Sequence, residues 1–81
     1  MQNPSKIDCI TILSAARELG DGTLLPLDAG TLGLSRNGMD TAMAFLIERD
    51  CFTSHRQADG HYAIGSLSLQ GKLRHDQLAN G

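Results

Sequence analysis

The run of residues 32–52 limits most strongly how this chain can fold, because it joins a helix break to a well-patterned helix. Gly33, Leu34 and Ser35 follow the pattern of a tight turn between two helices. Glycine adopts a left-handed conformation at low cost, and serine caps a following helix. We therefore predict a helix over residues 36–49, closed by Asp50 in the left-handed conformation.

The spacing within this predicted helix separates a buried face from a presented face. Apolar residues three or four positions apart lie on one side of a helix. Here they are Met39, Ala42, Met43 and Leu46. The opposite side carries Arg36, Asn37, Asp40, Thr41, Ala44 and Glu48. One side is expected to pack against the core, and the other to be presented to solvent or a partner.

The length of the chain allows a single domain. A chain of 81 residues is too short for two cores, since it buries only about 60% of its unfolded surface. The composition includes two Phe, one Tyr and no Trp, which leaves Leu, Ile, Met and Ala to build the core. Such a core suits packed helices. We expect one domain over residues 1–81 and exclude a multi-domain enzyme.

The cysteines and the first residues bear on localisation. Cys9 and Cys51 lie in apolar stretches and lack the density of a secreted disulfide scaffold, which favours buried free thiols. Residues 1–6 are polar without a signal-peptide pattern. The longest apolar run, residues 42–47, is far shorter than a membrane span. We expect a cytoplasmic protein that does not enter a membrane.

Net charge opposes a nucleic-acid function. Acidic residues outnumber Lys and Arg by nine to seven, giving a formal charge of −2. DNA affinity comes largely from cations that neutralise phosphates, and small domains devoted to DNA are usually basic. A local basic face can still exist in an acidic protein. Whether the chain can bind DNA therefore depends more on where its charges lie than on their total.

Three further elements are expected before the turn. A helix that starts at Asn3-Pro4-Ser5, where Asn or Ser can cap, should extend to the Gly20–Gly22 segment. Its apolar side is Ile7, Cys9, Ile10, Ile12, Leu13, Ala16 and Leu19. Residues 23–27 should be extended, because Pro26 disfavours helix in the residue before it. Residues 27–32 predict a weak helix of one or two turns, since Asp28 and Gly30 are poor interior helix formers.

After the presented helix we expect a β-hairpin over residues 52–64. The pair Asp59-Gly60 signals the turn, and a three-residue loop from Ala58 puts Gly60 in the left-handed position. This register places Phe52, Ser54, Tyr62 and Ile64 on one face and Thr53, His55, Gln57, His61 and Ala63 on the other. A two-residue loop would separate Phe52 from the other apolar residues, so the pattern favours three.

A final short helix should begin after Ser68, which can cap it. Leu69, Leu73 and Leu78 give this helix a narrow apolar stripe. The residues expected in solvent are Lys72, Arg74, His75 and Asp76.

The order of these elements resembles the winged helix-turn-helix superfamily over residues 5–78. The resemblance rests on the GLS turn, the presented helix, the hairpin and the segment LSLQGK. It implies an α+β fold with a three-helix core, a hairpin wing and a short C-terminal helix. The chain looks most like small winged-helix proteins of bacterial prophages and mobile elements. For these, DNA binding and transcriptional control are the commonest use, and protein–protein interaction is the regular alternative.

The resemblance also implies which residues would contact double-stranded DNA. The presented helix would enter the major groove and read bases through Arg36, Asn37 and Thr41. The wing would contact phosphate or the minor groove through His55, Arg56 and Gln57. Two simpler interpretations stay open. Arg36 and Asp40 are four apart and can form a surface ion pair, and Arg56 can be a solvated strand residue.

No catalytic or metal chemistry is expected. His55, His61 and His75 lack the paired spacing typical of strong zinc sites, and we interpret them as exposed residues of the wing and tail. No nucleophile motif, carboxylate pair or phosphate-binding glycine loop occurs in the context that each requires. We expect a protein without a cofactor that is not an enzyme.

Two hypotheses therefore remain. The first is a DNA-binding regulator that dimerises through Leu69 and Leu73 or through exposed parts of the first helix. The second is a winged-helix adaptor that binds a protein through the same presented helix or through Leu24, Leu25 and Leu27. Clustering of Arg36, Arg49, Arg56, Lys72 and Arg74 on one face would favour DNA. Their dispersal, with Asp40 and Glu48 dominant, would favour a protein partner.

Overall fold

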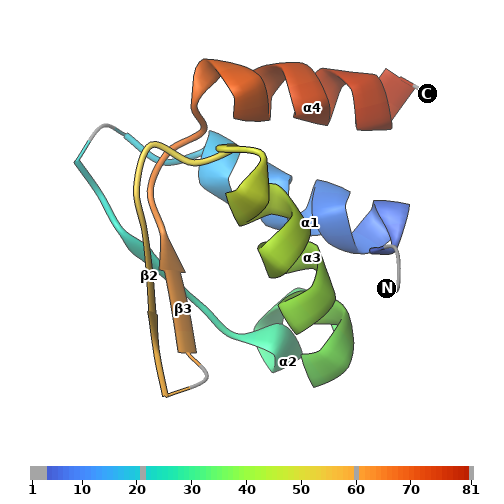
Figure 1. The fold of residues 1–81 in the computed structure, drawn as a ribbon, viewed down its shortest axis with the longest axis vertical. Helices are drawn as coiled ribbons and strands as arrows, with labels where there is room; N and C mark the ends of the chain where they lie inside the picture. The colour runs from blue at the N-terminus through green and yellow to red at the C-terminus, as the bar shows by residue number, and fades with distance from the viewer. Residues whose placement is uncertain (1–3, 21, 60, 81) are drawn as a thin grey trace.

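A computed structural model describes residues 4–20, 22–59 and 61–80 of the chain. Its elements in chain order are α1 (Lys6–Arg17), β1 (Leu25–Leu27), α2 (Ala29–Leu32), α3 (Arg36–Glu48), β2 (His55–Ala58), β3 (His61–Ile64) and α4 (Leu69–Asn80). Figure 1 shows the helices to one side of a small antiparallel sheet, with α4 alongside α1. The predicted α+β class is confirmed for these residues.

The central strand of the sheet is β3. It pairs with β1 on one side and β2 on the other, so the order is β1-β3-β2 and every pair is antiparallel. The strand β1 belongs to the chain before α2, whereas β2 and β3 form the hairpin after α3. This arrangement is compatible with a winged helix. It leaves β2 as an edge strand whose residues are all exposed.

Serine side chains cap three of the helices, as predicted. Ser5 begins α1, Ser35 begins α3 and Ser68 begins α4. Each Oγ accepts a hydrogen bond from the backbone N–H three residues later, at 3.4, 2.9 and 3.1 Å respectively. These bonds satisfy N–H groups that a helix leaves unpaired at its start. The ends of α3 also agree with the sequence, because the helix stops at Glu48 and Asp50 has a φ of 55°.

The predicted weak helix before the turn is the single turn α2. Asp28 is its cap rather than an interior residue, and its carboxylate accepts bonds from the Thr31 backbone at 3.1 Å and hydroxyl at 2.7 Å. These bonds lower the pKa of Asp28. Gly33 closes the turn in the predicted left-handed conformation, with a φ of 75°. The break between α2 and α3 is therefore locally determined.

The buried face of α3 is the predicted one, whereas that of α1 is rotated. Met39, Ala42, Met43 and Leu46 are all buried in the core. On α1 the buried residues are Cys9, Ile12, Leu13 and Ala16. Ile7 is 72% exposed, so its assignment to the core is wrong. It lies about 160° around the helix from Cys9, beyond the side that packs against α3 and α4.

The hairpin has a two-residue turn, so the three-residue loop is wrong. Ala58 pairs with His61, Gln57 with Tyr62 and His55 with Ile64. Cross-strand partners point to the same face, so the change by one residue reverses the faces of β2. Asp59 takes a positive φ of 51° in the turn. The left-handed conformation predicted for Gly60 lies outside the described residues.

The reason for this error is an irregular segment before β2. Phe52 forms an isolated bridge with Leu67, and the chain then bends at Thr53 before the regular strand begins at His55. The Gly65 N–H donates to the Ser54 carbonyl at 2.8 Å across this bend. Phe52 is therefore buried without sharing the alternation of Tyr62 and Ile64. The apolar pattern is satisfied by a break in the strand, which periodicity alone does not reveal.

The helix α4 also packs by a different face from the predicted one. Gly71 and His75 are buried, whereas Leu69 is 72% exposed and Leu73 is 50% exposed. A Cβ on Gly71 would collide with the carbonyl oxygen of Cys51. The close approach of α4 to the loop after α3 thus requires glycine at this position. The two leucines are left on the outer side, and only Leu78 of the predicted stripe packs against the core.

Candidate functional site

The exposed face of α3 has an uncharged centre. At about 100° per residue, Asn37, Thr41 and Ala44 lie opposite the buried residues, in line with Glu48 near the end of the helix. Asn37, Ala44 and Glu48 are exposed, and Thr41 is half-buried. We call Asn37, Thr41 and Ala44 the α3 stripe. It offers an amide, a hydroxyl and a methyl group, without a charge of either sign.

The flank of α3 toward the hairpin carries Arg36 and Asp40. The Tyr62 hydroxyl on β3 donates a hydrogen bond to Oδ1 of Asp40 at 3.0 Å. Burial raises the pKa of Tyr62, and the Asp40 carboxylate adds to the effect through the bond and its charge, while Arg36 opposes it. The Asp40 carboxylate is thus held against the hairpin rather than projecting from the α3 stripe.

The predicted wing residues divide between the two faces of the sheet. His55 and Gln57 share the face of their partners Ile64 and Tyr62, which contributes to the core. Arg56 points with Ala63 to the other face. All three residues of β2 are exposed, as a contact surface requires.

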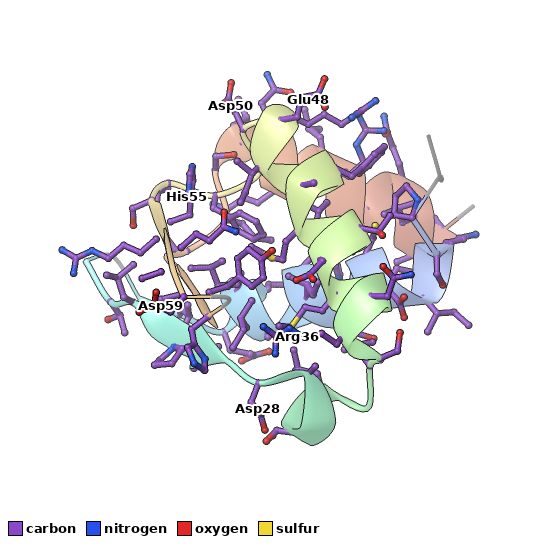
Figure 2. The ribbon with its side chains drawn as sticks, turned by 60° about the horizontal axis from the view of Figure 1, so that its bottom comes forward. Asp28, Arg36, Glu48, Asp50, His55 and Asp59 are labelled. Atoms are coloured by element: carbon purple, nitrogen blue, oxygen red, sulfur yellow. The ribbon has the colours of Figure 1, made fainter. Side chains whose placement is uncertain are left out.

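The hairpin turn and the start of α3 lie at the same end of the molecule, beside α2 (Figure 1). Figure 2 shows Asp28, Arg36 and Asp59 toward this end, and Glu48 and Asp50 at the opposite end. The bonds from Thr31 are the main cause that lowers the pKa of Asp28, and nearby His61 makes a smaller contribution. The six predicted contact residues are therefore all on the surface, but they do not form one compact basic patch.

A second group of cations lies on the other flank of α3. The Arg49 guanidinium carbon is 3.7 Å from the centre of the Phe45 ring, and that of Arg74 is 5.9 Å away. Arg36 and Arg49 stand at opposite ends of the helix, about 20 Å apart along its axis at 1.5 Å per residue. The basic residues are thus separated into different regions rather than gathered on one face.

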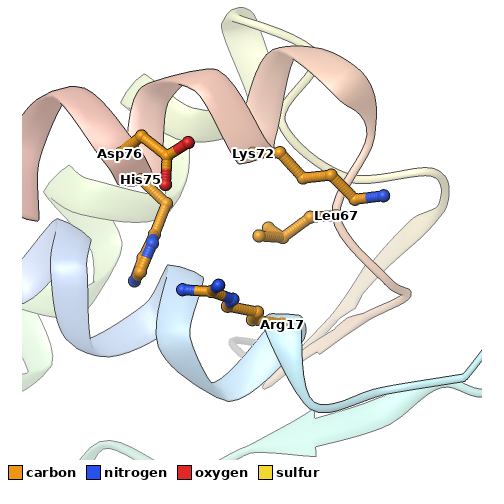
Figure 3. A pocket seen from close by; sticks show the side chains of 5 residues that line it. All are labelled: Arg17, Leu67, Lys72, His75 and Asp76. Atoms are coloured by element: carbon orange, nitrogen blue, oxygen red, sulfur yellow. The ribbon is translucent and has the colours of Figure 1, made fainter.

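A pocket of about 320 Å³ opens between α1 and α4, and Figure 3 shows the Arg17 and His75 side chains pointing toward each other there. The prediction that His75 is solvated is wrong, because it is 8% exposed. Its Nε2 lies 3.0 Å from the Ser14 hydroxyl, which satisfies the buried ring. The remaining lining residues are Leu67, Lys72 and Asp76.

The cysteines are buried free thiols, as predicted. Burial raises the pKa of Cys9 to about 11 and also raises that of Cys51. Thiols held protonated in this way are poor nucleophiles. Over residues 4–20, 22–59 and 61–80, no group of three His, Cys, Asp or Glu side chains is placed to hold a metal ion. In the same residues, no helix has both the length and the apolar character to cross a bilayer.

Comparison of the chain with models of protein families, with curated proteins and with solved structures found no match. The function must therefore be argued from the chain's own side chains.

Two features of the site are not evident from the sequence. The bond between Tyr62 and Asp40 joins positions 22 residues apart, and nothing in the local pattern marks either partner. The spacing of Phe45 and Arg49 at four positions does indicate a contact on one helix. The position of Arg74 near the same ring depends on where the fold places α4 relative to α3, which no local signal predicts.

Proposed function

We propose that this chain is a small DNA-binding protein of the winged-helix type that regulates transcription in the cytoplasm. In this proposal α3 enters the major groove and the hairpin of β2 and β3 is the wing. One observation carries it: α3 presents an uncharged, hydrogen-bonding stripe beside an exposed hairpin edge, with Arg36 between them.

The chemistry of the α3 stripe suits base recognition. The Asn37 amide can bond both N6 and N7 of adenine, and the Ala44 methyl can pack against the methyl group of thymine. The Thr41 hydroxyl can donate to or accept from either kind of base. Asp40, which would repel phosphate, is engaged by Tyr62. The centre of the helix therefore has groups that read bases.

The positions of Arg36 and β2 suit backbone contacts. Phosphates line both walls of the major groove, so a cation beside the reading stripe is well placed to bind one. His55 and Gln57 extend this surface on the inner side of the wing, and Arg56 faces outward. Contacts of this kind position the helix without specifying the sequence.

A protein-binding adaptor is the second candidate, and the charge distribution favours it. Arg36, Arg56 and the Arg49–Arg74 pair lie in different regions, and Glu48 ends the exposed face of α3. An overall charge of −2 adds to this argument. Such an adaptor would use α3 as a protein contact and would have no affinity for phosphates.

Fluorescence anisotropy of a labelled mixed-sequence duplex separates the two candidates. The DNA proposal predicts dissociation constants of about 1–100 μM that rise steeply between low and near-physiological salt. Arg36→Gln and Arg56→Gln should each reduce the slope of log K against log salt by about one. Arg17→Gln, in the pocket between α1 and α4, is the matched control and should leave the slope unchanged.

Absence of binding even at low salt would contradict the proposal and assign the surface to a protein partner. Equal losses in Arg36→Gln and Arg17→Gln would also contradict it, because binding would then depend on total charge alone.

A further inference from the structure

A basic groove lies on the flank of α3 that faces α4, away from the hairpin. Its volume is about 240 Å³, and its lining residues are Pro4, Lys6, Cys9, Phe45, Arg74 and Leu78. Arg49 adds a further cation at its edge, 3.7 Å above the Phe45 ring. We call this the Phe45 groove. Its floor is apolar and its rim is positively charged.

The charge of this rim is not neutralised from within. Two guanidinium groups at one ring repel each other, and among the described residues no carboxylate forms an ion pair with Arg49 or Arg74. The nearby Asp8 is directed elsewhere, since its Oδ2 lies 2.7 Å from the position of a Cβ on Gly38. Three of the seven Lys and Arg residues of an acidic chain thus surround one groove. Its charge is complementary to an anionic ligand.

The shape of the groove defines the ligand further. Pockets for small molecules usually enclose about 300–1,000 Å³, whereas this groove is smaller and suits one apolar side chain. The Phe45 ring is covered by Arg49, so a nucleobase could stack on that face only by displacing the guanidinium. Phosphates of duplex DNA have no apolar part to place against Cys9 and Leu78. An acidic peptide with an apolar residue can place that residue on the apolar floor and its carboxylates against the positively charged rim.

We propose that the Phe45 groove binds an acidic segment of a partner protein. One apolar side chain of that segment fills the groove, and its carboxylates pair with Arg74, Lys6 and Arg49. This interaction does not depend on DNA binding, because the groove lies on the flank of α3 toward α4, whereas Arg36 and the hairpin lie on the other flank. The Phe45 groove would then be a second binding surface, which takes an acidic protein segment where the α3 stripe takes DNA.

The probe for this proposal is a fluorescein-labelled synthetic peptide with glutamates on both sides of a central leucine, titrated with the full chain. Arg74→Gln should weaken its binding about tenfold, the effect of losing one charge-assisted hydrogen bond. Replacing the peptide's leucine by serine should cause a similar loss, because the apolar anchor is removed. Arg56→Gln removes the same charge from the outer face of the sheet and should change the affinity less than twofold.

Three results would overturn the proposal. The first is an absence of peptide binding. The second is equal weakening by Arg74→Gln and Arg56→Gln, or equal affinity for the leucine and serine peptides, which would show non-specific attraction to surface cations. The third is a loss of duplex DNA affinity in Arg74→Gln as large as that in Arg36→Gln, which would make the groove a phosphate contact. None of these results requires that the α3 stripe fails to bind DNA, so the two proposals are tested separately.

Discussion

At the scale of single residues, the bond between Tyr62 and Asp40 controls the chemistry of the presented face. It ties a carboxylate of α3 to the central strand of the sheet at 3.0 Å. Without it, Asp40 would be a solvated anion beside the α3 stripe. The same bond fixes the hairpin against the helix, so it links the stability of the fold to the charge of the site.

Tyr62→Phe should therefore lower the free energy of unfolding by about 1 kcal/mol, the usual net value of one hydrogen bond. Urea denaturation measures this change. Asp40→Ala supplies the matched control, because a double-mutant cycle isolates the pair. If the effects of the two substitutions are additive in the double variant, the bond between Tyr62 and Asp40 contributes nothing to stability, contrary to this prediction.

The raised pKa of the buried Cys9 thiol predicts how the stability of the fold changes at alkaline pH. Burial is the main cause that raises its pKa from 9.0 to about 11, and the charge of Asp8 adds to it. A raised pKa means that the folded state keeps its proton longer than the unfolded state. The stabilisation is complete below pH 9.0 and is lost as the pH rises to about 11.

Between these values the free energy of unfolding should fall by about 1.4 kcal/mol per pH unit from Cys9 alone. Cys51 and Tyr62, whose pKa values are also raised, add falls of the same sign. Cys9→Ala should flatten the profile measured by denaturant unfolding at a series of pH values. An unchanged slope in this variant would show that the thiol does not titrate in this range.

At the scale of elements, the position of α4 depends on one glycine. Alanine is favoured over glycine inside a helix by about 1 kcal/mol, but a Cβ on Gly71 would collide with the Cys51 carbonyl. We expect Gly71→Ala to destabilise the protein by about 1–3 kcal/mol, as overpacking does. Thermal or urea unfolding measures the change.

Gly30→Ala in α2 is the matched control. The Cβ would meet only Asp28 Oδ2 at an ordinary 3.6 Å, so this substitution should stabilise by up to about 1 kcal/mol through helix propensity. If both variants are stabilised, α4 does not depend on close approach to the loop after α3.

The elements that the sequence predicts correctly are those determined by interactions between residues close together in the chain. Ser5, Ser35 and Ser68 cap helices through bonds to residues three positions away, and the buried face of α3 follows from spacing alone. The hairpin register and the orientation of α4 depend instead on long-range packing. The bend at Thr53 lets Phe52 reach the core out of register, so an alternation argument favours the wrong loop.

The predictions for the site divide in the same way, because the sequence indicates which residues are exposed but not how distant segments come together. All six predicted contact residues lie on the surface, where their polarity places them. The face of the sheet that His55 and Gln57 occupy depends on the register, and the sequence places them on the face opposite Tyr62 and Ile64, whereas the structure pairs them with these residues. The cations at Phe45 come from α3 and α4 together, so their convergence requires the folded chain.

At the scale of the whole molecule, the exposed leucines of α4 bear on assembly. Leu69 and Leu73 are one helical turn apart on its outer side. A regulator that reads paired half-sites needs a dimer, and we propose that Leu69 and Leu73 form its contact rather than the exposed part of α1. Light scattering should then give twice the mass of one chain.

Leu69→Ser combined with Leu73→Ser should convert this dimer to a monomer with little change in monomer stability, because both side chains are exposed. Ile7 on α1 is as exposed as Leu69, and Ile7→Ser should leave the dimer intact. A monomeric wild-type chain would contradict the assignment, and dissociation by Ile7→Ser alone would move the contact to α1.

Contact of the α3 stripe and the wing with DNA can be followed residue by residue through amide chemical shifts. The full chain, labelled with ¹⁵N, would be titrated with a duplex, and each amide followed. If this contact forms, the largest shifts should occur at Arg36, Asn37 and Thr41 and along β2, with little change in α4. Shifts confined to α1 and α4, or no shifts at low salt, would contradict it.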